Sequence, residues 1–238
     1  MTFTVLVYAL LGGLLPSLIW LYFLLKEDAR HPEPKKLIAL AFIVGMVAVP
    51  LALPLEQYAK NFFIADGQNI TLQVLAAWAL IEEVLKYAVA ATVILWRPAV
   101  DEMPDYVIYM ITVALGFAAA ENMLFLLTPL MQGAAAGSVF TGDIRFLGST
   151  LLHIVASASI GFALAFSHKS SAVIRIAVGA FGLILAVALH TAFNALIISE
   201  GASATFAAFI FVWIAAVVFL ATFEVLKYLQ YKDISPNP

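Results

Sequence analysis

The sequence predicts an all-α polytopic membrane protein, a bundle of about seven transmembrane helices that forms one integral-membrane domain over residues 1–238. Hydrophobic residues make up 64% of the chain and charged residues only 11%, whereas a soluble domain carries roughly a quarter charged residues. Seven apolar stretches are long enough to cross a bilayer, which takes about 20 residues. Most charges fall in the short connectors between these stretches. We therefore expect the lipid bilayer to be the solvent for most of the surface.

The seven apolar stretches give the predicted helices in chain order. The first lacks a basic leading region and is too long for the core of a signal peptide, so we expect a retained span. The predicted spans are 3–25, 37–55, 72–96, 106–127, 146–167, 174–198 and 204–225. Between them, the connector 26–36 is the most polar segment, and the connector around 128–145 is rich in glycine, alanine and serine.

The distribution of lysine and arginine predicts the orientation, because cytoplasmic loops carry an excess of both. Nine of these residues lie in the odd-numbered connectors and the C-terminal tail, against two in the even-numbered connectors. The nine are Lys26, Arg30, Lys35, Lys36, Arg97, Lys169, Arg175, Lys227 and Lys232, and the two are Lys60 and Arg145. We therefore expect a multi-pass protein of the cell membrane with its N-terminus outside and its C-terminus in the cytoplasm.

Several functions are excluded by what the chain lacks. It has no cysteine, which excludes a disulfide framework, a thiolate nucleophile and a cysteine-ligated zinc site. It has no basic tract, so no nucleic-acid partner is expected. All aspartates lie in predicted connectors or the tail, and neither HExxH nor GxSxG occurs. These absences argue against an aspartate dyad, the usual helical zinc-peptidase motif and a serine nucleophile elbow.

Ionisable residues nevertheless fall inside four of the predicted spans, between about residues 72 and 198. They are Glu82, Glu83, Lys86, Glu121, His153 and His190. Each charged side chain costs about 2.5–3.5 kcal/mol at the centre of a helix on insertion scales, so several are kept only where they pair or function. At about 1.5 Å per residue, the acidic and histidine side chains come out roughly 9–15 Å below the outer ends of their helices. The four helices are therefore predicted to place these groups in one layer, in the outer half of the membrane.

The spacing within the third span suggests different roles for its two glutamates. Lys86 follows Glu82 by four residues and Glu83 by three, so either carboxylate can pair with the ammonium. The two glutamates point about 100° apart around the helix. One carboxylate can therefore be neutralised by Lys86 while the other faces a cavity.

Two asparagines accompany the histidine and glutamate of later spans. Asn194 lies four residues after His190 and shares its helix face, whereas Asn122 follows Glu121 and points elsewhere. A buried carboxylate can take a proton from water near neutral pH, and a histidine with an amide donor can hold a developing oxyanion. This set of residues predicts a hydrolytic active site within the bilayer.

The same residues occur in an order that resembles a known family. The motifs are EExxK (Glu82, Glu83, Lys86), FAxxEN (Phe117, Ala118, Glu121, Asn122), a lone histidine (His153) and HxxFN (His190, Phe193, Asn194). Together they resemble the PrsW family of intramembrane proteases over about residues 26–198. The first connector, with Asp28 and the PEPK run at 32–35, is similar to a segment of the same family.

The resemblance implies site-1 cleavage of an anti-sigma factor, which would make a membrane-anchored protein the substrate. The family also resembles, more distantly, the CAAX prenyl endopeptidases and their bacterial relatives. By that likeness Glu82 is the base that activates water, and His190 with Asn194 forms the oxyanion hole. This chain has Lys86 four residues after Glu82 where those enzymes have arginine at the fifth position, and it has Glu121 where they have histidine.

The mechanism is open between two versions. In the metal-free version a buried glutamate activates water, and Glu121 shares a proton with Glu82 or Glu83. In the other version, glutamates and histidines hold zinc and leave one position open for water. The candidate metal ligands are a subset of Glu82, Glu83, Glu121, His153 and His190, with Lys86 and Asn122 in supporting roles.

Two other functions fit the same residues. Buried ionisable groups also serve as relays in ion- or proton-coupled transporters, although the chain has neither the internal repeat nor the matched broken helices typical of transporters. A non-catalytic membrane scaffold or receptor could keep the polar cluster for assembly. That alternative predicts that the glutamates of the cluster and His190 can be replaced without loss of function.

Overall fold

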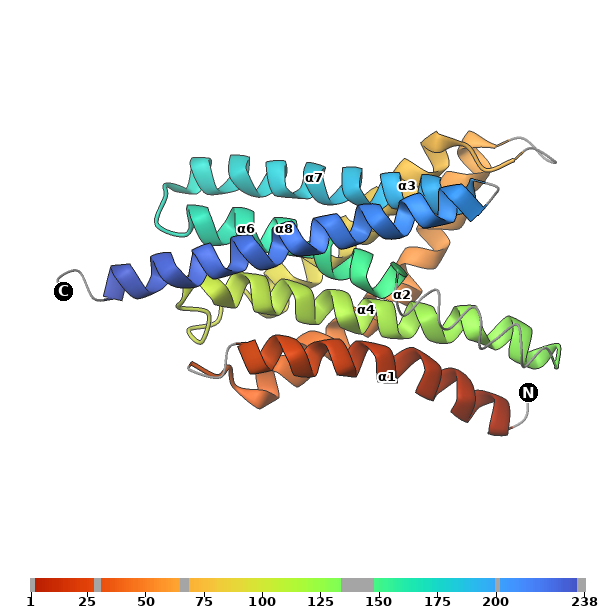
Figure 1. The fold of residues 1–238 in the computed structure, drawn as a ribbon, viewed down its shortest axis with the longest axis horizontal. Helices are drawn as coiled ribbons and strands as arrows, with labels where there is room; N and C mark the ends of the chain where they lie inside the picture. Colours follow the sequence, from red (N-terminus) through yellow and green to blue (C-terminus); the bar gives the residue numbers. More distant parts are fainter. Residues whose placement is uncertain (1–2, 28–30, 65–68, 134–147, 200–201, 235–238) are drawn as a thin grey trace.

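The described part of the protein is a bundle of long α-helices (Figure 1). The structure is a computed structural model that describes residues 3–27, 31–64, 69–133, 148–199 and 202–234. Its helices are α1 (Phe3–Glu27), α2 (Lys35–Phe63), α3 (Leu72–Val93), α4 (Met103–Met131), α6 (Thr150–Ser167), α7 (Ala172–Ile198) and α8 (Ala202–Ile234). No strand occurs in these ranges. The all-α fold class is confirmed.

Six of these helices are long and apolar enough to cross a membrane, namely α1, α2, α4, α6, α7 and α8. The exception among the described helices is α3, because it carries Glu82, Glu83 and Lys86 within 22 residues. It packs between α2 and α7, so its polar side chains face protein. The first residues of α1 and the last residues of α8 lie at opposite ends of the bundle (Figure 1).

The predicted spans agree with the helices except at some ends. Two helices continue well beyond their predicted ends, α2 by eight residues from 55 to Phe63 and α8 by nine residues from 225 to Ile234. Residues 56–61 (EQYAKN) are mostly polar but compatible with a helix, so the helix outlasts the apolar stretch on which the prediction depended. The start of the predicted span 146–167, most of the glycine- and alanine-rich connector and Asp28 lie outside the described residues.

The centre of the bundle is α4, which packs against α1, α2 and α6. Glycines make these contacts close enough for backbone to touch backbone. A Cβ atom on Gly116 would lie 1.9 Å from the Phe42 carbonyl oxygen, and one on Gly45 would lie 2.0 Å from the Val113 carbonyl oxygen. Small residues at such crossings let helices pack tightly in lipid. The crossing of α2 and α4 therefore fixes the position of the helix that carries Glu121.

A polar contact lies at the N-terminal end of α4. Asp105 was expected in a connector, but it lies in the first turn of α4, where its carboxylate accepts the backbone N–H groups of Asp101 and Glu102 at 2.9 and 2.7 Å. The buried Tyr109 hydroxyl donates a hydrogen bond to Glu33. Because Asp105 and Glu121 are 16 residues apart, about 24 Å along the helix, these carboxylates are separate from the cluster described next.

Candidate active site

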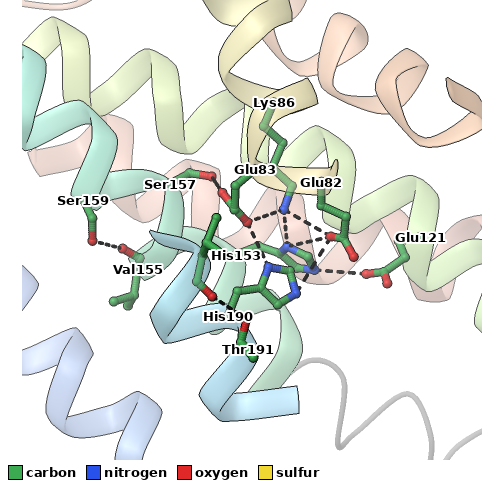
Figure 2. Close-up of polar contacts among 11 residues, drawn as sticks. Glu82, Glu83, Lys86, Glu121, His153, Val155, Ser157, Ser159, His190 and Thr191 are labelled. Atoms are coloured by element: carbon green, nitrogen blue, oxygen red, sulfur yellow. Dashed lines mark hydrogen bonds and ion pairs between the residues drawn. The ribbon is translucent and has the colours of Figure 1, made fainter. Parts of the chain in front are cut away.

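Four helices bring the ionisable residues of the spans into one cluster (Figure 2). Its members are Glu82, Glu83 and Lys86 from α3, Glu121 from α4, His153 from α6 and His190 from α7. All are buried except Glu121, whose side chain is 20% exposed. The cluster is therefore largely closed to its surroundings, and Glu121 is its most accessible carboxylate.

Lys86 lies at the centre of the cluster and contacts both glutamates of its own helix. Its Nζ lies 2.7 Å from Glu83 Oε1 and 3.3 Å from Glu82 Oε2. The same atom lies 4.3 Å from the centre of the Phe117 ring on α4, which adds a cation–π contact. The stronger contact with Glu83 shows which carboxylate Lys86 chiefly neutralises.

His153 has a partner at each ring nitrogen. Its Nδ1 lies 2.8 Å from Lys86 Nζ, and its Nε2 lies 3.0 Å from Glu121 Oε2. An ammonium group is a donor without acceptor capacity, so Nδ1 accepts and Nε2 carries the hydrogen that is donated to Glu121. This arrangement makes His153 a neutral imidazole that links the cation of α3 to the carboxylate of α4.

Glu83 is fully buried, and both of its carboxylate oxygens are bonded. Its Oε1 accepts from Lys86 and also lies 2.9 Å from His190 Nδ1, while its Oε2 accepts from the Ser157 hydroxyl at 2.9 Å. Because Oε1 already accepts from the ammonium, His190 is the donor in the third bond. Glu83 thereby orients the ring of His190, and in the neutral ring this bond leaves Nε2 without a hydrogen.

Glu82 faces the two histidines at longer range. Its Oε2 lies 3.9 Å from His190 Nε2 and 4.0 Å from His153 Nδ1. One ligand atom each from Glu82, His153 and His190 lie within 4.8 Å of one another, and all three residues are buried. Two imidazoles and one carboxylate are the ligand set of many catalytic zinc sites.

The charges of the cluster do not balance. Its described members include three carboxylates and one ammonium. An unpaired charge in a buried setting must be compensated by a proton or a cation. This excess of negative charge favours either protonation of a glutamate or binding of a divalent cation, which are the two versions that the sequence left open.

The two asparagines singled out by the sequence are placed differently. Asn122 is buried and donates a hydrogen bond to Thr150 Oγ1 at 3.1 Å, which joins α4 to α6 beside the cluster. Asn194 is half-buried one turn beyond His190. Within the described residues, Asn194 is not among the groups that hydrogen bond to the cluster. Its role in an oxyanion hole stays a prediction.

Ser157 is a contact that sequence reasoning missed as part of the site. It lies four residues after His153 on α6, so the two share a helix face. That spacing is a signal for a second polar group on the same face, about 6 Å further along the helix. A serine in an apolar helix is too common, however, for the spacing alone to single it out.

Glu56 was missed for a different reason, because the second span was predicted to end at residue 55. In the structure Glu56 is half-buried within α2. Trp78 lies one helical turn before Glu82 on α3, and its Nε1 donates to the backbone carbonyl oxygen of Glu56 at 2.9 Å. The Glu56 carboxylate interacts electrostatically with Glu82 and Glu121. A fourth acidic residue therefore lies near the cluster.

Comparison with known proteins places this arrangement in a family. Residues 33–222 match the model of a family described as "PrsW family intramembrane metalloprotease". The chain is 33% identical over 130 residues to a protein named Protease PrsW from Oceanobacillus iheyensis, a match that covers 54% of this chain and 59% of that protein. It is 24% identical over 183 residues to Protease PrsW from Bacillus subtilis, covering 77% and 79% of the two chains.

A further relative extends this comparison. Protease PrsW from Geobacillus kaustophilus is 25% identical over 143 residues, or 59% of this chain and 62% of that protein. The matches to the Oceanobacillus and Geobacillus proteins thus span less than two thirds of the lengths of those proteins. No solved structure matches the chain. The family model covers most of the chain and includes all of the cluster, so the chain belongs to the PrsW family of intramembrane metalloproteases.

Proposed function

We propose that the protein hydrolyses a peptide bond of a membrane-anchored protein, and that the cluster is its active site. The observation that carries this proposal is the meeting of Glu82, His153 and His190, with Glu121 beside them, inside a membrane bundle. Membership of a family of membrane proteases supports it. A scaffold gives no reason for a carboxylate and two histidines to adopt the ligand spacing of a metal site, and the sequence lacks the internal repeat typical of transporters.

The residues present fit a divalent cation, and zinc suits them best. Glu82, His153 and His190 would hold it through one oxygen and two nitrogens. His190 already donates its other nitrogen to Glu83, which is the usual arrangement behind a metal-bound histidine. Such a cation would polarise the substrate carbonyl and activate a water molecule. The excess negative charge of the cluster supports the same reading.

With Glu82 as a ligand, Glu83 and Glu121 would have different roles. Glu83, bonded at both oxygens, positions His190 and neutralises Lys86. Glu121 is the most exposed carboxylate and lies next to His153, so it is the group best placed to take the proton from the attacking water. It would return that proton to the nitrogen of the broken peptide bond, which leaves as an amine.

Binding of a cation would break two of the four contacts of Lys86 and leave the other two. Its bonds to Glu82 and His153 involve residues that would bind a cation, whereas its contacts with Glu83 and Phe117 do not. A shift of the ammonium toward Glu83 and Phe117 would free the nitrogen of His153. Lys86 would then continue to neutralise Glu83 at the edge of the site.

One observation favours the metal-free version. The Lys86 ammonium already lies among Glu82 and His153, so it supplies a positive charge to the cluster. In that version Glu82 would be the base, as the resemblance to the CAAX endopeptidases implies. The oxyanion would need another donor than neutral His190, since the hydrogen of that ring is donated to Glu83. Asn194 is the nearest amide on the same helix face.

The orientation and the substrate class are part of the same proposal. The excess of lysine and arginine in odd-numbered connectors supports an orientation with the N-terminus outside and the C-terminus in the cytoplasm. The cluster then lies in the outer half of the membrane. This depth suits a first cut near the outer face of a single-span protein. An anti-sigma factor is the substrate that the family resemblance implies.

The test is cleavage of single-span membrane proteins, including anti-sigma factors, that are reconstituted in vesicles with the purified full chain. Wild type should yield two fragments, and Glu82→Gln, Glu121→Gln and His190→Ala should not. Loss of cleavage on chelation and its return with zinc would support the metal version, whereas unchanged cleavage would leave the metal-free one. Equal cleavage by wild type and all three variants would overturn the assignment of the cluster as the active site.

A further inference from the structure

The hydroxyl of Ser157 makes an unusual contact for a serine in an apolar helix. A serine in such a helix commonly donates to the carbonyl four residues earlier. Ser159 does so to Val155 at 3.1 Å, and Ser167 does so to Ala163 at 2.6 Å. Ser157, on the same helix α6, instead donates across to Glu83 of α3 at 2.9 Å (Figure 2).

This contact fixes the rotation of the Glu83 carboxylate. Ser157 holds Oε2, and Oε1 is therefore directed toward Lys86 and His190. Ser157 and Glu83 are both fully buried, so no water is at hand to replace the hydroxyl. Without it Oε2 would be left unsatisfied, and the carboxylate would gain by rotating to share its donors between both oxygens.

The orientation of His190 depends on that carboxylate. Its Nδ1 hydrogen is donated to Glu83 Oε1, which in the neutral ring leaves Nε2 bare, and this atom lies 3.9 Å from Glu82 Oε2. A bare nitrogen is what a metal ligand or a proton acceptor needs. A ring released by Glu83 could place its hydrogen on Nε2 and lose that capacity.

We propose that Ser157 is a positioning residue that acts through Glu83 to set the tautomer and ring orientation of His190. The consequence for turnover rests on the proposed peptidase function, whereas the consequence for the His190 ring does not. The chain also offers a matched control, because Ser159 lies two residues further along the same helix and donates to the Val155 carbonyl oxygen of that helix.

The first measurement is nitrogen-15 NMR of the full chain, labelled at histidine and reconstituted in lipid. The chain has four histidines, and His190→Gln identifies the signals of His190 by their loss. Wild type should show a protonated Nδ1 and a bare Nε2 at His190. Ser157→Ala should show a mixture of both tautomers. Ser157→Thr, which keeps a hydroxyl, and Ser159→Ala should both show the wild-type signals.

The second measurement is the rate of peptide cleavage by the same variants. Loss of a group that orients a metal-binding or catalytic histidine typically lowers activity 10- to 100-fold. We expect Ser157→Ala to lower kcat by about that factor with little change in KM, and Ser157→Thr to recover most of it. Should Ser157→Ala not fold, Ser157→Cys keeps the volume and replaces the hydroxyl with a weak donor.

The two measurements fail independently. His190 signals in Ser157→Ala that match those of wild type, or a wild type with hydrogen on Nε2, would overturn the positioning role. A wild type that shows the expected tautomer but cleaves no substrate would instead count against the proposed function and leave the role of Ser157 standing.

Discussion

The imidazole rings of His153 and His190 meet edge to face, with their centroids 5.2 Å apart and their planes at 88°. They come from adjacent helices but hydrogen bond to different glutamates, His153 to Glu121 and His190 to Glu83. The two histidines are therefore not interchangeable. Each contacts a carboxylate from a different helix, His153 that of Glu121 on α4 and His190 that of Glu83 on α3.

The zinc content of the purified protein should depend on His190 if Glu82, His153 and His190 are the metal ligands. Wild type purified without chelator should contain about one zinc per chain, as measured by mass spectrometry of the metal. His190→Ala should lose most of it, because one of three ligands is absent. The control is His168→Ala, whose ring lies at the end of α6 and contacts the Ala165 carbonyl. Equal zinc content in wild type and His190→Ala would contradict the ligand set.

Replacement of Glu121 should separate binding of the metal from catalysis. Glu121→Gln keeps the size of the side chain but cannot accept a proton from water. We expect kcat to fall by about 10²- to 10⁴-fold, the usual contribution of a general base, while zinc content stays at the wild-type level. If zinc is lost in parallel with activity, Glu121 is a ligand rather than the base.

The pair of Lys86 and Glu83 should be strongly coupled in stability. Both side chains are fully buried and 2.7 Å apart, and removing one partner of such a pair costs about 3–5 kcal/mol because the other charge is left buried. Lys86→Met and Glu83→Gln should each lower the free energy of unfolding by about this amount. The double variant should lose much less than their sum. Additive losses, measured by denaturant titration in detergent, would show that the two residues act independently.

Close packing of α2 against α4 should make Gly116 intolerant of substitution. In Gly116→Ala the new methyl group would lie 1.9 Å from the Phe42 carbonyl oxygen, so the helices must separate. We expect a loss of about 1–3 kcal/mol in unfolding free energy, as is typical of overpacking. Gly179→Ala is the control, because its nearest neighbour would be a Leu164 methyl at an ordinary 3.5 Å. Equal stability of the two variants would mean that the crossing is looser than described.

A positive charge at position 56 should weaken binding of a divalent cation. Glu56→Lys exchanges a carboxylate that interacts with Glu82 and Glu121 for an ammonium. Two unit charges about 10 Å apart in protein interact by about 1–2 kcal/mol, and an interaction of this order would lower zinc affinity by about tenfold or more. Gln57→Lys introduces an ammonium at the next residue, which is exposed and bonded to Asn61. Because it changes the charge by one unit where Glu56→Lys changes it by two, it should have less than half the effect. An unchanged affinity in Glu56→Lys would place residue 56 outside the electrostatic range of the site.

Much of the fold follows from hydropathy and helical geometry. The apolar stretches are long enough to mark all the described helices, and α3 was found despite its charges because the flanking residues are apolar. The sequence also predicted that the polar groups of four helices lie at one level of the bundle, because position along a helix converts directly into distance, and these groups contact one another in the structure. What hydropathy cannot give is how far a helix continues past the lipid, and so Glu56 was placed outside α2.

Contacts between helices were harder to predict. Spacing showed that Lys86 could pair with Glu82 or Glu83, but the choice depends on Ser157 and His190, which reach Glu83 from two other helices. The Phe117 ring beside Lys86 is a further example. Such contacts depend on the rotation of each helix about its axis, and no residue spacing within one helix determines that rotation relative to another.

The narrow contact face of α7 has a practical consequence for experiment. Its buried residues form one stripe, and they are Gly179, Gly182, Ala186, His190 and Phe193. The opposite side, including Ile184 at 67% exposed, faces away from the bundle. Because the chain has no native thiol, a cysteine introduced at position 184 would be a unique labelling point. A fluorescent or spin label there would report the arrival of a substrate helix from the lipid, on the same helix as His190 but without contact with the cluster.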